Sequence, residues 1–430
     1  MHSKSKHGIE IREMTRMLYK MKSSLSKFFF IAQTALMHRI ILRTYDVQSV
    51  NNYIKMVQLK TSPPHLARMV FETKSELINF EVIGDIDCTK KLSRSRVESY
   101  VSYLAILNKV KIVGSSSLIY GKFGFVINDT LADPDFGQFV SLENETYVAT
   151  RHHKTVVAFP PRARRKVDKA FHLSGLFAGH FGHWYAEFLP RLRHFEKLEG
   201  FESVPILVNK SMPSSHFELL KYFCDNELIY VEDGECFKIK ELLVAPTITF
   251  FPSKYVPDHP VPFERQSSWS AGAMRYMRTK ILAHFPLEAQ QTRAIYLSRK
   301  NSSWGVVSNE AEVEDCLREL GFEIVQPERH SFAEQVAILR SSHTIVAATG
   351  SALNSLMLAN KDTNMLLLGQ AENHNWGGWS GPMRDVGFDP KFLLMQSGSR
   401  TEKHLPVEVD INRLRSVLVR MLENENRHEP

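Results

Sequence analysis

Between residues 294 and 368, short apolar runs alternate with segments whose apolar residues recur at helical spacing. The runs AIYLS, FEIV, HTIVAA and NMLLL are the length of strands and are bounded by polar or turn residues, which predicts four strands. Helical patterns fill the gaps, from Asn309 to Leu320, from Ser331 to Leu339 and over ALNSLMLAN. Because parallel strands need such crossover helices, the alternation predicts an α/β fold with a parallel sheet covered on both faces, half of a Rossmann-like domain.

The joints between these elements carry helix-boundary signals. Asn309 with Glu312, and Ser331 with Glu334, have the spacing of a capping box at a helix start. Gly321 follows the first helix, where a left-handed C-terminal cap favours glycine. We therefore expect both helices to begin and end at these residues.

Ligands of open parallel sheets bind outside the carboxyl ends of the strands. The loops at those ends hold Arg299, Glu328 and the turn from Thr349 to Ser351. An arginine and a glycine turn at a helix start suit a diphosphate, because both offer hydrogen-bond donors and positive potential. The alternative is that Arg299 pairs with a surface acid and Gly350 only joins strand to helix. The chain has no G-x-G-x-x-G and no P-loop motif, which argues against a dinucleotide fingerprint.

A second candidate lies upstream, where the loop GLFAGHFG runs into HWYAEFLPRLRHFEKLE. As a helix, this segment places His183, Glu187 and Arg191 on one polar stripe, beside an apolar stripe that begins at Trp184. Pro190 lies within the pattern and is expected to kink the helix or end its first turns. The polar stripe is either catalytic or an ordinary acid and base pair on a surface helix.

The rest of the chain suggests a second domain of the same kind. Residues 61–170 contain short β runs, and strand-helix-strand alternation returns between Val204 and Pro252. The proline-rich FFPSKYVPDHPVPFE is the predicted interdomain linker. We therefore expect a first Rossmann-like domain over 61–255 and a second over 270–400, with a helix in 405–430 that docks back on the first domain.

These motifs together carry a resemblance to a known family. The strings HWYAEFLPRL, YLSRK, SNE, SFAEQ and TGSAL, in this order, resemble glycosyltransferase family 61 from about Val110 to Leu368. The resemblance implies a GT-B fold, two Rossmann-like domains facing each other across a cleft. It also implies inverting, metal-independent transfer of a sugar from a nucleotide-sugar, with a UDP-sugar favoured, to a hydroxyl of a glycan acceptor. The sequence departs from the family at Gly305, where an arginine is usual, and at Thr349, where many members have histidine.

The resemblance and the pattern together nominate site residues. Glu187 and His183 are the candidate catalytic bases. The candidate donor-binding residues are Arg299, Thr349, Gly350, Ser351, Glu334 and Asn309. The candidate acceptor or cleft residues are Trp184, Arg191, Trp376 and Trp379. The last two tryptophans lie in a glycine-rich loop and either stack on sugar rings or anchor that loop on a core.

Two other functions stay open at this point. A relative that binds glycans without catalysis is one, because the arginine expected at Gly305 is missing. A serine hydrolase or acyltransferase using Ser351 is the other, although no G-x-S-x-G motif surrounds this serine.

Charge is concentrated at the start of the chain. Residues 1–60 hold 11 Lys and Arg against 3 Asp and Glu, whereas the other 370 residues hold 43 against 44. The apolar centre of this basic arm, FFFIAQTAL, is too short to span a bilayer. The arm either lies on an anionic membrane surface, or is a basic helix that packs on the domain or is partly disordered. We expect a cytoplasmic protein, peripheral on the inner face of the membrane in the first case, and no nucleic-acid partner.

No cofactor is expected from the sequence. The cysteines lie far apart without a C-x-x-C pair, as is typical of reduced thiols: Cys88, Cys224, Cys236 and Cys316. There is no H-E-x-x-H motif. The two D-x-D triplets, 85–87 and 133–135, lie outside the Rossmann-like half that holds the candidate donor site and are interpreted as turns, so no metal site is predicted.

Overall fold

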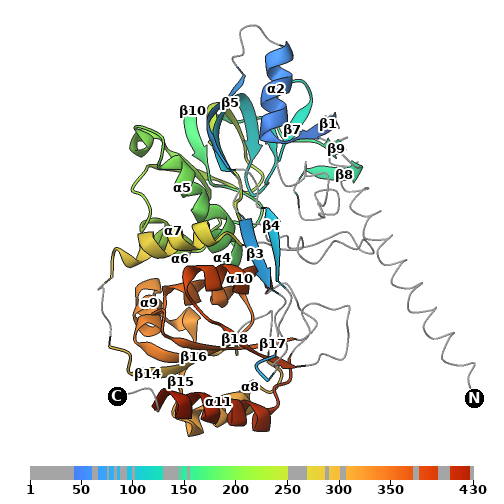
Figure 1. The fold of residues 1–430 in the computed structure, drawn as a ribbon. Coiled ribbons are helices and arrows are strands. Elements are labelled where there is room, and N and C mark those ends of the chain that lie inside the picture. The colour runs from blue at the N-terminus through green and yellow to red at the C-terminus, as the bar shows by residue number, and fades with distance from the viewer. Residues whose placement is uncertain are drawn as a thin grey trace, which may run out of the picture.

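A computed structural model gives the structure of most of the chain. It describes residues 43–60, 66–74, 77–81, 85–87, 94–98, 102–128, 145, 147–152, 155–249, 269–285, 290–300, 307–370, 377–395 and 407–426. These residues form a mixed α/β protein with an 11-stranded sheet, a five-stranded sheet and a separate two-stranded hairpin (Figure 1). The predicted α/β class is confirmed.

The five-stranded sheet contains the four strands that the sequence predicted and one more, Lys391–Met395, and it is parallel throughout. Its strands are β14 (Arg293–Leu297), β15 (Glu323–Val325), β16 (Ser342–Ala348), β17 (Asn364–Gln370) and β18 (Lys391–Met395). Its helices are α8 (Glu310–Glu319), α9 (Phe332–Arg340), the 3-10 helix η7 (Ser351–Leu358), α10 (Gly377–Val386) and α11 (Ile411–Asn426). The strand order β15-β14-β16-β17-β18 puts a topological switch point between β14 and β16, where open sheets bind ligands.

The helix-boundary signals are largely confirmed. The Ser331 Oγ accepts a hydrogen bond from the Glu334 N–H at 3.3 Å, and the Glu334 carboxylate accepts one from the Ser331 N–H at 2.7 Å. Gly321 has a φ of 83° at the end of α8. Asn309 precedes α8 but its side chain does not cap it. Its amide makes two hydrogen bonds with the backbone of Val409, at 2.8 and 2.9 Å, and thereby ties the segment before α11 to α8.

The 11-stranded sheet combines a parallel part with a mostly antiparallel part. The parallel strands are β12 (Leu228–Val231), β11 (Ile206–Asn209), β10 (Arg165–His172) and β13 (Cys236–Val244). The remaining strands are β1 (Arg43–Gln48), β2 (Ala67–Thr73), β5 (Ser102–Val113), β6 (Ile119–Tyr120), β7 (Phe125–Ile127), β8 (Val148–His152) and β9 (Thr155–Ala158). β13 pairs antiparallel with β5, which joins the two parts. The short β runs predicted before residue 170 are thus strands of the same sheet as the later alternation.

The end of the predicted basic arm, residues 43–60, is part of the folded first half of the chain. Strand β1 is part of the first sheet, and helix α2 (Val50–Lys60) packs against that sheet. Tyr45, Val47 and Tyr53 are buried in the cores beside it. Several predictions fall outside the described residues: residues 1–42, Cys88, the 133–135 triplet, Gly305, the linker from residue 250 and Trp376. In the described part, no helix has the length and apolar character needed to cross a bilayer.

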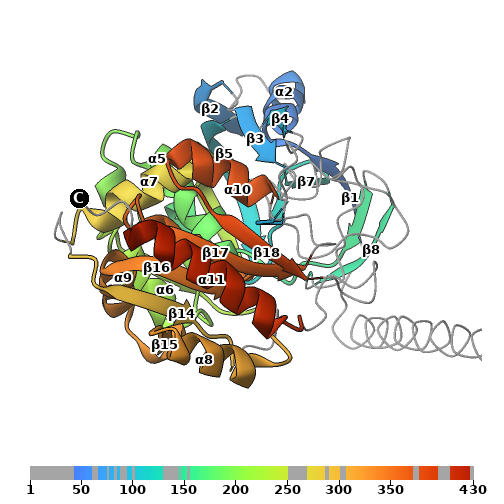
Figure 2. The ribbon, with the colours of Figure 1, turned by 60° about the horizontal axis from the view of Figure 1, so that its bottom comes forward.

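The last helix contradicts one expectation. The apolar face of α11, with Leu414, Val417 and Leu418, packs into the core of the second sheet with Tyr296 and Val313. This face therefore packs mainly on the second sheet and not on the first domain, although Ile86 of the predicted first domain also packs against this core. Together with α8, the helix covers one face of the second sheet, and it lies in front of the strands in Figure 2.

Polar contacts do link α11 to the earlier part of the chain. Arg413 pairs with Asp85 at 2.5 Å, and Arg420 pairs with Asp87 at 2.8 Å. The Ile86 N–H between them donates to the Phe392 carbonyl oxygen at 2.7 Å. The 85–87 triplet contains the expected turn, and its carboxylates bind arginines.

Two further elements lie between the sheets. The hairpin of β3 (Leu77–Glu81) and β4 (Arg94–Glu98) extends from the first sheet to α10 (Figure 1). Helix α7 (Ala271–Leu282) contacts both halves, since the Tyr276 hydroxyl donates to Glu196 at 2.6 Å and Arg278 donates to the Ala359 carbonyl oxygen at 2.7 Å.

Candidate active site

The HWYAEFLPRL segment forms an irregular helix. It begins as α4 (Phe181–His183), widens into the π-helical segment η2 (Trp184–Phe188), tightens into the 3-10 segment η3 (Leu189–Arg191) and continues as α5 (Leu192–Phe195). Pro190 has no N–H to donate to Ala186, so the regular hydrogen-bond ladder cannot pass through it. The expected break at Pro190 is confirmed, as a change of helix type on either side of the proline.

The polar stripe of this helix holds an acid and base pair. His183 Nδ1 lies 2.8 Å from Glu187 Oε2, and both residues are buried. The His183 ring stacks on Phe177, with the centroids 4.9 Å apart. His180 meets it edge to face, and burial, followed by the charge of His183, lowers the pKa of His180. The pair is therefore oriented from several sides within a largely dehydrated site.

Arg191 does not bind the Glu187 carboxylate in any contact that the structure describes. Its Nε donates to the Glu187 carbonyl oxygen at 3.0 Å, and its guanidinium donates to Thr247 Oγ1 at 2.7 Å. The guanidinium also lies over the Phe188 ring. Arg191 thus links the helix to the segment that follows β13.

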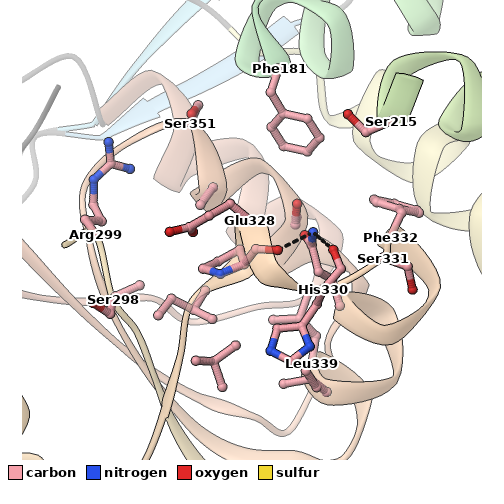
Figure 3. Close-up of a pocket in the computed structure, with 18 of the residues that line it drawn as sticks. Phe181, Ser215, Ser298, Arg299, Glu328, His330, Ser331, Phe332, Leu339 and Ser351 are labelled. Atoms are coloured by element: carbon pink, nitrogen blue, oxygen red, sulfur yellow. Dashed lines mark hydrogen bonds between the residues drawn. The ribbon is translucent and has the colours of Figure 1, made fainter. Parts of the chain in front are cut away.

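A cavity of about 430 Å³ opens at the carboxyl ends of β14, β15 and β16 (Figure 3). Its walls include Arg299, Glu328 and Ser351 from the second sheet. The facing wall comes from the first half of the chain, with Phe181 pointing toward the second sheet and Ser215 beside it. The cavity therefore lies between the two halves, at the edge where the sequence predicted a ligand site.

Arg299 and Gly350 fit together closely. A Cβ at Gly350 would overlap the guanidinium of Arg299. Gly350 has a φ of 169°, which is extended backbone open to any residue, so the glycine is required by space alone. Burial lowers the pKa of Arg299, opposed by the charges of Tyr296, Glu310 and Glu328. An arginine remains cationic, and an anion beside it would offset the cost of its burial.

A buried carboxylate holds the loop that carries Arg299. Glu310 accepts hydrogen bonds from the Ser298 hydroxyl at 2.8 Å and the Arg299 N–H at 2.9 Å through Oε1, and from the Tyr296 hydroxyl at 3.1 Å through Oε2. Ser298 also donates to Glu314 at 2.9 Å. These bonds fix the backbone at the carboxyl end of β14.

The two candidate groups meet where α4 crosses the turn after β16. A Cβ at Gly182 would come within 3.0 Å of the Ser351 Cβ. Gly182 immediately precedes His183, and Ser351 immediately follows Gly350. The small residues at both positions thus allow the acid and base pair and the Arg299 turn to approach from opposite halves.

Other nominated residues have structural contacts. Glu334 caps α9, Asn309 binds Val409, and the Thr349 N–H donates to the Leu368 carbonyl oxygen. None of these three lines the cavity. The cleft assignment of two tryptophans is wrong, because both are fully buried: Trp184 donates to the His216 carbonyl oxygen, and Trp379 belongs to the main core.

Sequence reasoning missed several residues of the cavity wall. His330 and Phe332 lie on it, at the loop after β15, and Gln335 holds that loop by donating to the carbonyl oxygens of Pro327 at 2.8 Å and His330 at 3.1 Å. This loop follows the carboxyl end of a strand, where ligands of open sheets bind. The capping pattern at Ser331 predicts only the start of a helix and says nothing about the residues beside it. Phe181 carried no local signal, because tertiary packing brings it to the cavity.

The described residues contain no group of three or more His, Cys, Asp or Glu arranged to hold a metal ion. No curated protein shows significant similarity to the sequence. Residues 181–366, which contain the irregular helix, the Arg299 loop and the Gly350 turn, match the family model Glycosyltransferase 61. This match supports the assignment to glycosyltransferase family 61 that the sequence motifs indicated.

Proposed function

We propose that this glycosyltransferase moves a sugar from a nucleotide-sugar, with a UDP-sugar favoured, to a hydroxyl of a glycan acceptor, with inversion and without a metal. The observation that carries the proposal is the cavity between the two sheets, which has Arg299 on one wall and adjoins the His183 helix on the other. A GT-B arrangement, with donor and acceptor bound by different halves, accounts for a site in this place. Such a reaction belongs to polysaccharide or glycan biosynthesis.

The donor diphosphate would bind at Arg299 and the turn from Gly350 to Ser351. Arg299 offers a partly buried positive charge, and the absence of a Cβ at Gly350 lets its guanidinium lie against the backbone of the turn. In a metal-independent transfer, these groups stabilise the leaving diphosphate electrostatically. Glu310 preserves this geometry by holding the Arg299 N–H and the Ser298 hydroxyl.

The acceptor proton would be taken by the His183 and Glu187 pair. Inversion requires a single displacement, in which a base removes the proton of the attacking hydroxyl while the diphosphate leaves. His183 Nδ1 binds Glu187, so a histidine base would act through Nε2, whereas a glutamate base would use the imidazole as its orienting group. Both assignments place the base on the helix that adjoins the Gly350 turn.

The alternative with Ser351 as a nucleophile has less support. Among the described residues, no histidine or carboxylate makes a hydrogen bond to the Ser351 hydroxyl, and His183 binds Glu187 instead. The second alternative is a protein that binds glycans but does not transfer sugar. It differs from the proposed enzyme only in having no turnover. Activity with purified protein separates all three functions.

The direct test measures nucleotide-sugar binding and sugar transfer. A thermal-shift screen of UDP- and GDP-sugars should identify a stabilising donor, and Arg299→Ala should weaken its binding by about 2 to 3 kcal/mol. Arg293→Ala is the matched control, because Arg293 lies at the opposite end of β14 and pairs only with Glu323 in the contacts described. Transfer without binding loss in Arg299→Ala would remove this arginine from the site, and hydrolysis of an ester in place of transfer would support Ser351.

A further inference from the structure

Three lysines stand side by side on the first sheet. The register aligns Lys166 of β10 with Lys238 of β13, and Lys238 with Lys111 of β5. Directly paired residues of neighbouring strands project to the same face of a sheet. All three lysines are exposed, so they form a row across three adjacent strands. We call this row, with the exposed residues beside it, the lysine face.

The lysine face extends beyond the row. Lys240 and Asp168 lie two residues farther along β13 and β10, and Lys109 lies two residues before Lys111. All of them are exposed. With five lysines against one aspartate, the face carries a net charge of +4. The ion pairs of the described residues include none of these five lysines.

The stability of the fold does not explain this arrangement. Like charges directly opposite each other on neighbouring strands destabilise a sheet. The row contains two such pairs, Lys166 with Lys238 and Lys238 with Lys111. The three strands that carry them lie inside the sheet and not at its edges. A concentrated field of one sign raises the local concentration of anions, which gives the face a use in binding.

An exposed aromatic ring lies close to the lysine face. The β5 and β6 strands pair Lys111 with Tyr120, and the turn that follows Tyr120 carries Lys122 and Phe123. Phe123 is 50% exposed and has a φ of 59°, a left-handed backbone that a bulky residue rarely adopts. A large apolar side chain beside lysines is the combination with which proteins bind lipid headgroups and the upper acyl region.

We propose that the lysine face docks on an anionic lipid bilayer. A sheet presents its lysines in one plane, which matches a flat layer of charged headgroups. Lysine ammonium groups act as point charges and need no bidentate partner, whereas specific nucleic-acid sites rely on arginine forks and stacking rings. The face lies at the amino ends of β10 and β13, about 20 Å from the carboxyl end of β13 at a rise of about 3.3 Å per residue. Docking would therefore leave the cavity between the sheets clear of the lipid.

The experiment compares two triple variants in the full chain. Lys111→Gln, Lys166→Gln and Lys238→Gln together remove the row, and Lys74→Gln, Lys221→Gln and Lys361→Gln remove three exposed lysines elsewhere for the same change in net charge. Partitioning is measured by co-sedimentation with vesicles of phosphatidylglycerol and phosphatidylcholine, and with phosphatidylcholine alone. Since a lysine near an anionic surface contributes about a factor of five, removal of the row should lower partitioning by about 100-fold. The control variant should partition nearly as the unmodified chain does.

Two readouts make the result decisive. The thermal midpoint of the row variant should be unchanged or higher, because repulsion between lysines is relieved. Phe123→Trp should show a blue shift of its fluorescence with anionic vesicles only. Equal partitioning of the two triple variants would overturn the proposal. Loss of binding to single-stranded DNA or to an anionic polysaccharide, with vesicle binding intact, would also overturn it and assign the face to that polyanion.

Discussion

The guanidinium of Arg299 occupies the space that a side chain at Gly350 would need. Gly350→Ala should therefore displace Arg299 without straining the backbone, since the φ of 169° suits any residue. We expect nucleotide affinity to fall by about 10- to 100-fold, the effect of losing one charge-assisted contact. Gly179→Ala is the control, because no atom lies within 4 Å of its added Cβ. Calorimetric titration with the free nucleotide measures both, and equal affinities would show that Arg299 does not bind the donor.

The base is tested by substitutions that preserve size. Glu187→Gln retains a hydrogen-bond acceptor for His183 but cannot take a proton, so sugar transfer should fall by about 100- to 10,000-fold with little change in donor binding. His183→Asn should cause the smaller loss if the histidine only orients Glu187, and the larger loss if the roles are reversed. Single-turnover rates distinguish the two cases. Near-normal rates in both variants would mean that the pair is structural.

Removal of metal ions tests the source of electrostatic stabilisation. If Arg299 and the Gly350 turn stabilise the leaving diphosphate, transfer should persist in an excess of EDTA. The measurement is the initial rate after dialysis against chelator, with and without added manganese. A rate that disappears and then returns with manganese would contradict the metal-independent mechanism.

His172 gives the folded protein a specific sensitivity to acid. Burial, followed by the charge of Arg191, lowers the pKa of His172 to about 3, from an ordinary value of 6.5. Between these values the unfolded chain binds a proton that the folded chain does not, so stability should decrease as the pH falls from 6.5 toward 3. His172→Gln should show a shallower decrease of the urea midpoint over that range. Parallel pH profiles for the two proteins would contradict the assignment.

The basic arm can be separated from the lysine face. Because β1 begins at Arg43, deletion of residues 1–42 removes most of the basic arm and leaves the first sheet complete. If the arm is a peripheral membrane anchor, the first of the two alternatives that its sequence leaves open, the shortened chain should sediment less with anionic vesicles and transfer sugar to a soluble acceptor at the normal rate. Unchanged sedimentation would assign vesicle binding to the folded part of the chain.

The sequence predicted the second sheet well because its signals are local. Each strand and helix from Ala294 to Leu368 has its own periodicity and boundary residues, and the parallel pairing follows from the alternation. The same topology predicted the edge of the sheet at which the cavity lies, since ligands of open sheets bind at the carboxyl ends of the strands. The helix after Gly350 is 3-10 rather than a regular α-helix, which periodicity does not distinguish over so few residues.

The failures concern contacts between segments far apart in the sequence. The sequence pattern nominated Trp184 and Trp379 as cleft residues, but tertiary packing buries both. Asn309 has the spacing of a cap, yet its amide binds a backbone 100 residues later. The spacing of apolar residues in α11 correctly predicted a helix. Such a pattern does not show which part of the protein the apolar face packs against.

The ion pairs that Asp85 and Asp87 make with α11 connect two distant parts of the chain. The β3 and β4 hairpin lies against α10, and the Ile86 backbone binds that of Phe392, so an early segment of the chain is fastened to its last elements. Cleavage anywhere between residues 251 and 268 would therefore yield two fragments that remain associated. The two sheets are held at more than one point, and a nucleotide-sugar would enter the cavity through rearrangement of its side chains rather than through separation of the halves.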